Sequence, residues 1–283
     1  MPIREKGYYN WDGELKTSRF NWLPIFMNGI KTVYKKRFSK FVFAVSGIPF
    51  LIFMVAIYVS SKPELKMLSQ LVREIQTDAL LFNTYYTNGF LIFMMMVISV
   101  FAGAELIAGD LKYKSFTLYL SRPLSWMDYI TGKFSIVLFY LLAFTLVPGI
   151  LMIFFKIIFT GSVSISPRVL LAAFGFPILV SFFLASLSIL ISSLTTNLRM
   201  AKIMIFVVYL LSNVVAHMFR EIFRSRSFLH FSIDENIRQF GSFIFNTRGG
   251  GFYTEGFVSG IILLALTLIF LTIVMVRIKR VEV

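Results

Sequence analysis

Residues 134–157 read FSIVLFYLLAFTLVPGILMIFFKI, and they are apolar almost without interruption. Their only charged residue is Lys156, next to the end of the run. A helix that crosses a bilayer needs about 20 mainly apolar residues, and this run is long enough. The run is continuously apolar and does not alternate, which argues against a transmembrane β-barrel. It therefore predicts a membrane-spanning α-helix.

Similar runs lie on both sides of this one. Six spans are predicted in all, at about 41–59, 88–108, 134–157, 169–195, 201–219 and 256–276. The first 40 residues are polar, and no signal peptide precedes the first span. We therefore expect an all-α integral membrane protein. It would have a cytoplasmic N-terminal segment, 1–40, and a transmembrane domain of six helices, 41–283.

The composition agrees with a membrane protein. Of the 283 residues, 57% are hydrophobic and 15% are charged, whereas soluble domains carry about 25% charged residues. Cys is absent, which excludes a disulfide scaffold and thiolate metal sites. His217 and His230 are the only histidines, too few for a histidine-rich metal centre. We expect no catalytic, metal or cofactor site in the chain.

The net charge of +14 sits in the segments between the apolar runs. Such a distribution indicates membrane topology, and we expect no nucleic-acid partner. The N-terminal 40 residues alone hold nine Lys or Arg. Six spans place both termini on one side, and the basic residues then predict that this side is the cytoplasm. The loop 220–255 carries five Arg on the other side, but long loops translocate largely regardless of charge.

Amphipathic stretches flank the spans. Before the first span, Pro24 suits a first helical turn, and apolar residues share one face of the helix that follows. We expect this helix to lie in the membrane interface, with Lys35, Lys36 and Arg37 at anionic lipid heads. A second stretch begins at Pro63, and a third contains Ile237, Phe240 and Ile244. Gly249, Gly250 and Gly251 predict a flexible turn before the sixth span.

The segment between spans two and three, residues 103–133, reads GAELIAGDLKYKSFTLYLSRPLSWMDYITGK. Pro123 stops a helix, because proline lacks a donor and clashes with the preceding turn. Ser125 and Asp128 form an S-x-x-D pattern, which predicts a capping box at the start of the third span. The segment therefore predicts a short cytoplasmic helix, a sharp turn and a newly capped spanning helix.

This segment resembles the loop between spans two and three of ATP-binding-cassette (ABC) type-2 permeases. Asp110 stands at the acidic position of the family pattern, and Gly132 and Lys133 match its end. The middle is matched by Leu118, Leu120, Ser121, Arg122, Pro123, Leu124 and Ser125. Lys114 and Ser115 depart from the Gly-Thr step of the family, and Trp126 stands where an Arg is common. The six-span layout extends the resemblance over nearly the whole chain.

The resemblance implies an exporter subunit of the cytoplasmic membrane. The loop would form a coupling helix that docks on a separate ATPase subunit, and that subunit would bind ATP and Mg²⁺. Two ATPases and two permease chains, identical or homologous, would make the working unit among membrane lipids. The docking residues implied are Asp110, Lys112, Tyr113, Lys114, Phe116, Arg122 and Pro123.

The chain has no ATPase site of its own in this interpretation. A phosphate-binding loop needs G-x-x-x-x-G-K followed by Ser or Thr. Gly132-Lys133 is the only Gly-Lys pair, and Met127 and Phe134 occupy the other positions. Two alternatives remain: a membrane-embedded enzyme that modifies lipids, and a scaffold or sensor subunit with the same fold and no transport.

Polar residues inside the spans are few. Asn213 and His217 are four apart, hence on one helix face, and they could line a substrate path or a dimer contact. An interhelical hydrogen bond is the simpler interpretation of the same pair. In span four, small residues recur on one face and predict close packing against another helix; they are Ser181, Ala185, Ser188 and Ser192.

Overall fold

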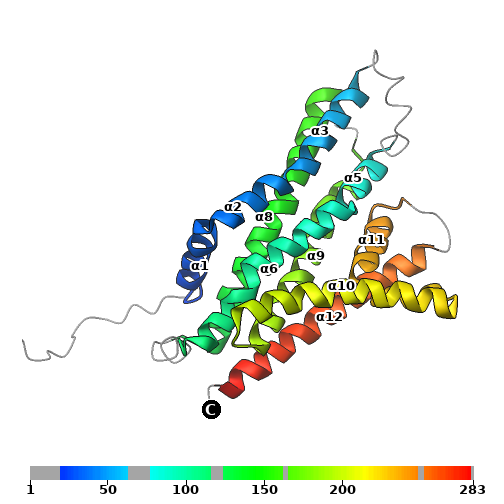
Figure 1. Cartoon of the computed structure of the whole chain (residues 1–283). Helices are drawn as coiled ribbons and strands as arrows, with labels where there is room; N and C mark the ends of the chain where they lie inside the picture. The colour runs from blue at the N-terminus through cyan, green and yellow to red at the C-terminus, as the bar shows by residue number, and fades with distance from the viewer. Residues whose placement is uncertain (1–19, 63–76, 116–123, 162–164, 248–251, 282–283) are drawn as a thin grey trace, which may run out of the picture.

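The computed structural model describes residues 20–62, 77–115, 124–161, 165–247 and 252–281. Within these ranges every regular element is a helix (Figure 1). In chain order they are α1 Leu23–Lys35, α2 Arg37–Ser46, α3 Ile48–Ser61, α5 Asp78–Tyr86, α6 Gly89–Lys112, α8 Trp126–Thr160, α9 Pro167–Leu194, α10 Leu198–Phe223, η3 Arg226–Phe231, α11 Ile233–Ile244 and α12 Phe252–Val281.

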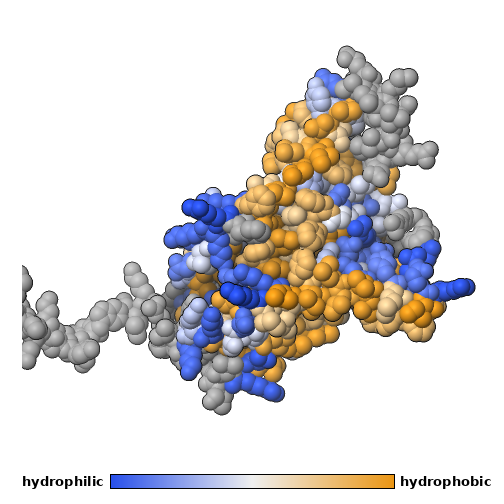
Figure 2. Space-filling view, viewed as in Figure 1, coloured by the Kyte–Doolittle hydropathy of each residue, from blue (hydrophilic) through white to orange (hydrophobic). Residues whose placement is uncertain are grey.

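Six of these segments are long and apolar enough to cross a membrane, as predicted. The first, Lys40–Ser61, consists of α2 and α3 in succession, which meet at Gly47. Pro49 lies in the first turn of α3, where its missing N–H leaves no gap in the helix. Apolar side chains cover much of the surface along the bundle (Figure 2). The chain is a multi-pass membrane protein.

The structured helices are longer than the predicted spans. The third span was predicted at 134–157, whereas α8 runs from Trp126 to Thr160. Its start is fixed by the predicted capping box. The Ser125 hydroxyl accepts from the Asp128 amide at 3.1 Å, and the Asp128 carboxylate accepts from the Ser125 amide at 3.2 Å. Hydropathy marks only the apolar part of a helix, so the range 134–157 omits the polar first turns of α8, whose start the capping box predicted.

Helix α9 occupies the centre of the bundle. Its small residues face α6, as their spacing predicted: the Ser188 hydroxyl donates to the Ser99 carbonyl at 3.1 Å. The Ser192 hydroxyl donates to the Ala104 carbonyl at 2.8 Å and accepts from the amides of Ile107 and Ala108 at 3.0 Å. These bonds fix α9 to the last turns of α6.

The bundle has two ends with different contents (Figure 1). We call basal the end that holds α1, the last turns of α6, the first turns of α8, the turn between α9 and α10, and the end of α12. We call apical the end that holds the end of α3, α5 and α11. Arg277 of α12 donates to the Leu194 carbonyl at 3.4 Å, and this bond connects α12 to the last residue of α9 at the basal end.

Helix α1 packs across the first half of α8 at the basal end. Pro24 lies in its first turn, as predicted. Val33 is buried, and the Tyr140 hydroxyl of α8 donates to the Ile30 carbonyl at 2.7 Å. A Cβ on Gly132 would lie 3.0 Å from the Ile25 side chain, so the two helices touch closely there. Tyr34, in the last turn of α1, is exposed. The interfacial position of α1 stays a prediction.

Polar contacts at the apical end were not predicted. Lys156 of α8 forms an ion pair with Asp78 at the start of α5. The Tyr86 hydroxyl of α5 donates to the Ala173 carbonyl of α9 at 3.0 Å. Burial raises the pKa of the Tyr86 phenol well above its usual value, so the hydroxyl remains a donor. Both contacts fix α5 to the spans.

The third amphipathic stretch forms α11, in which Ile237 and Phe240 are buried. The stretch that begins at Pro63 lies mostly outside the described residues, as do Gly249, Gly250 and Gly251.

Candidate coupling site

The candidate site is built from the two helix ends that border the loop between α6 and α8. Asp110 lies in the last turn of α6, and Lys133 lies in the third turn of α8. Their side chains form an ion pair with 2.7 Å between Lys133 Nζ and Asp110 Oδ2. The Tyr129 hydroxyl donates to the same oxygen at 2.7 Å. The two ends of the sequence motif therefore meet in space.

This clasp, formed by Asp110, Tyr129 and Lys133, is shielded from solvent. The side chains of Lys133 and Asp110 are only 9% and 15% exposed. Lys133 also donates to the Leu106 carbonyl of α6 at 3.1 Å, and its ammonium lies over the Tyr129 ring. A buried charge pair is costly to break from one side, because the remaining buried charge loses its counter-charge. The clasp therefore holds the ends of α6 and α8 in one geometry.

A second charged group lies one to two turns earlier on α6. Glu105 pairs with Lys36, at the junction of α1 and α2, and with Lys202 of α10. One carboxylate thus connects three segments that are far apart in the sequence. We call this group the Glu105 node. Ser192 of α9 bonds the backbone of α6 on either side of Glu105, so the node sits on a fixed stretch of helix.

The predicted docking residues fall into separate groups. Asp110 belongs to the clasp and is turned toward α8. Lys112, Tyr113 and Lys114 follow it and are exposed, with the Lys112 ammonium over the Tyr113 ring. Lys114 adopts a positive φ of 52°, and the Ser115 amide donates to the Asp110 carbonyl at 2.9 Å, which ends the helix. The other predicted residues, Phe116, Arg122 and Pro123, lie outside the described residues.

The polar pair predicted in span five is Asn213 and His217, and the two side chains lie in different environments. The Asn213 side-chain oxygen accepts from the Ser232 hydroxyl at 2.7 Å and from the Asp234 amide at 3.2 Å. It thereby holds the start of α11 on α10. His217, one turn later, is exposed. A role of either residue in a path or a dimer contact stays a prediction.

The analysis of the sequence missed the side chains that complete the site. Lys36 was assigned to lipid heads, and neither Glu105 nor Lys202 was given a partner. A carboxylate inside a predicted span should have prompted a search for its cations. Lys133 was noted as part of the motif and Tyr129 was not singled out. Their spacing of four residues puts them on one face of α8, which was a usable signal. Within the described ranges, no group of three or more acidic or histidine side chains could hold a metal ion.

A comparison with models of protein families matches most of this chain. The model described as ABC-2 family transporter protein matches residues 30–283. The chain belongs to this family. The match includes the clasp, the Glu105 node and all six spans, so this is a membrane permease of the ABC-transporter type. A comparison with curated proteins found no match.

Proposed function

We propose that this ABC-2 permease is the membrane subunit of an exporter in the cytoplasmic membrane, with both termini in the cytoplasm. A separate ATPase subunit, which binds ATP and Mg²⁺, would dock on the segment 105–133. Two ATPase copies and a second permease chain, identical or homologous, would complete the unit. The observation that carries the proposal is the clasp, because it fixes both ends of this loop to two spanning helices.

The clasp suits the transmission of a push from the docked ATPase. Helices are stiff and close-packed interiors pass strain on, so a force on the loop would reach α6 and α8 together. From α8 the displacement would reach α1, which touches it at Gly132. From α6 it would reach α1 and α10 through the Glu105 node. ATP-driven closure would thereby be passed on to α1, α6, α8 and α10.

The docking surface itself would be formed by the exposed residues beyond the clasp. Tyr113 is 68% exposed at the end of α6, with Lys112 and Lys114 beside it. An aromatic ring between two cations suits a groove that is apolar at its base and acidic at its rim. Positioning by the clasp and docking by Tyr113 are separate roles, and variants can distinguish them.

The first test is purification of the tagged chain in mild detergent with mass-spectrometric identification of stoichiometric partners. We expect a co-purifying protein that carries a phosphate-binding loop and hydrolyses ATP. Tyr113→Ala should weaken this association while leaving Tm unchanged. A preparation without any ATPase, repeated across several detergents, would overturn the proposal and favour the scaffold or lipid-enzyme alternatives.

The second test separates the clasp from the docking surface. Asp110→Asn and Lys133→Gln should each lower the ATPase activity of the complex at least about tenfold, as expected for a coupling loss of about 1.4 kcal/mol. The exchange of Asp110→Lys with Lys133→Asp should restore part of it. Glu221→Gln, an exposed carboxylate at the far end of α10, is the matched control. Full activity in both single variants would contradict a coupling role.

A further inference from the structure

The far end of α10 carries a cluster of aromatic rings that the function proposed above does not use. Phe219 and Phe223 lie in the last two turns of α10, and their ring centroids are 5.8 and 4.9 Å from that of Phe228 in η3. Phe228 in turn stacks on Phe231 at 6.3 Å. Helix α10 ends at Arg224 with a positive φ of 48°, and η3 follows directly. We call the four phenylalanines the aromatic tip.

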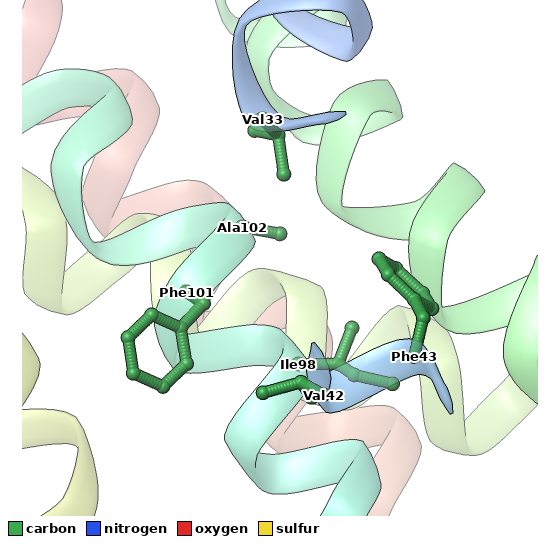
Figure 3. Close-up of a pocket in the computed structure, with 6 residues that line it drawn as sticks. All are labelled: Val33, Val42, Phe43, Ile98, Phe101 and Ala102. Carbon is green, nitrogen blue, oxygen red and sulfur yellow. The ribbon is translucent and has the colours of Figure 1, made fainter. Parts of the chain in front are cut away.

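The outer side of the aromatic tip is exposed. Phe223 is 59% exposed and Phe231 65%, and Ile222 beside them is 62% exposed. This end of α10 lies at the edge of the molecule (Figure 1), where hydrophobic side chains reach the surface next to hydrophilic ones (Figure 2). The apolar contact between α1 and α6 is the opposite case, because Val33 and Ala102 face each other and are buried (Figure 3).

The length of α10 places the aromatic tip at an edge of the hydrocarbon layer. Between Lys202 and Arg220 the helix carries no Asp, Glu, Lys or Arg. At 1.5 Å per residue, the two charged residues are about 27 Å apart along the helix. The hydrocarbon core of a bilayer is about 30 Å thick. With Lys202 at the basal boundary, Arg220 and the aromatic tip therefore lie at the apical one.

Basic residues surround the aromatic tip. Residues 217–231 contain Arg220, Arg224 and Arg226, all exposed, and a single acidic residue, Glu221. Glu221 lies 3.9 Å from Arg220, and its own side chain is 79% exposed. Guanidinium groups suit phosphate, and rings beside them suit the boundary between headgroups and acyl chains. A second copy of the chain fits less well, since a two-fold contact at this tip would bring the same arginines together.

We propose that the aromatic tip is inserted in the apical lipid leaflet and binds anionic headgroups through Arg220 and Arg224. The rings of Phe223 and Phe231 would lie just below the headgroups. Helix η3, which follows the fifth span, would then lie in the membrane and not in water. The start of α11 would be held at that depth. This lipid contact is made by this chain alone and does not depend on the ATPase.

Quenching by brominated lipids tests the proposal on the full chain, in vesicles of equal parts phosphatidylglycerol and phosphatidylcholine. The chain has no Cys, so Ser227→Cys provides one exposed position in η3 for a fluorescent label. Bromine is placed on the acyl chains of one lipid at a time. Both lipids should quench the label, and brominated phosphatidylglycerol should do so about twofold more strongly. Absence of quenching would place η3 in water or against a second chain, and equal quenching would remove the anionic preference; either result would overturn the proposal.

The role of the arginines is tested in the same labelled chain. Arg220→Gln combined with Arg224→Asn should make quenching by the two lipids equal, and Asn is chosen because it tolerates the positive φ. Arg199→Gln is the matched control, since it removes an exposed arginine at the basal start of α10. It should leave the twofold difference unchanged. A wild-type difference in the double variant would also overturn the proposal.

The role of the rings is tested by Phe223→Gln combined with Phe231→Gln. Loss of these apolar groups should lower quenching by both lipids about twofold, because η3 would leave the acyl boundary. Phe154→Gln removes a ring of α8 that is 64% exposed, and should leave quenching unchanged. If the double variant does not fold, as judged by thermal unfolding, Phe231→Gln alone takes its place. Wild-type quenching after loss of the rings would contradict insertion.

Discussion

Helices α9 and α10 follow each other in the chain, yet they occupy opposite environments. In the most apolar window of α9, 72% of the residues are buried in the protein, against 17% in α10. Small side chains of α9 approach α6 closely, whereas Leu211, Val214 and Ile222 of α10 face outward. Both are apolar enough to span a membrane. Side-chain size and hydrogen bonding, and not hydropathy, distinguish the central helix from the peripheral one.

The difference in burial between α9 and α10 follows from the lipid that surrounds a membrane protein. Lipid tails are as apolar as Leu, so no hydrophobic force drives a large aliphatic residue from lipid into the protein. Close packing and interhelical hydrogen bonds decide which helix becomes central, and both favour the serines of α9. The exposed face of α10 is then available to lipid or to a second permease chain.

The largest effect is expected where α6 meets α9. A Cβ on Gly103 would lie 2.6 Å from the Ser188 Cβ, so Gly103→Leu must separate the two helices. We expect a loss of about 3 kcal/mol, the upper range for overpacking. Thermal unfolding in detergent measures it as a fall in Tm. Val214→Leu, a similar enlargement on the exposed face of α10, should leave Tm unchanged. Equal effects of the two changes would refute the contrast between α9 and α10.

A smaller effect is expected within α10, where Asn213 makes polar contacts with the start of α11. Asn213→Ala removes the acceptor of the Ser232 hydroxyl and the Asp234 amide, and should cost about 1–2 kcal/mol. Protection of the α11 amides in hydrogen exchange should fall as well. His217→Ala, one turn away and exposed, is the control and should change neither quantity. Identical behaviour of the two variants would argue that α10 does not hold α11.

A third prediction concerns the hydrogen bonds of α9. Ser192→Ala removes its bonds to the α6 backbone and should lower stability by about 1 kcal/mol, the scale found for interhelical bonds in membranes. Ser193 is buried too, but its hydroxyl donates only to the Leu190 carbonyl of its own helix. Ser193→Ala should therefore cost less. Chemical unfolding of both variants, compared with wild type, gives the difference, and a reversed order would contradict the interhelical role.

The smallest effect is expected on the outer face of α10. Leu211 is 54% exposed, so Leu211→Ala removes little packing and should change stability by less than about 0.5 kcal/mol. Light scattering after size-exclusion chromatography should then report whether association of two chains weakens. A marked fall in Tm for the isolated chain would show that this face is packed within the protomer.

Local patterns predicted much of the fold and part of the site. The spans, the capping box of Ser125 and Asp128, and the first turn at Pro24 all depend on residues a few positions apart. The motif also drew attention to both Asp110 and Lys133. It did not indicate that they pair, and it grouped Asp110 with Tyr113 as a docking residue. In the structure, Asp110 faces α8 while Tyr113 faces outward.

The sequence by itself determined that this chain is helical, that it spans a membrane six times, and where several helices begin. Continuous apolar length and local capping bonds carry that information. Only the tertiary structure decided which helix is central and which charges meet. Glu105 joins Lys36 and Lys202 across long separations in the chain. Such contacts depend on how helices pack, and hydropathy does not encode packing when lipid and protein interior are equally apolar.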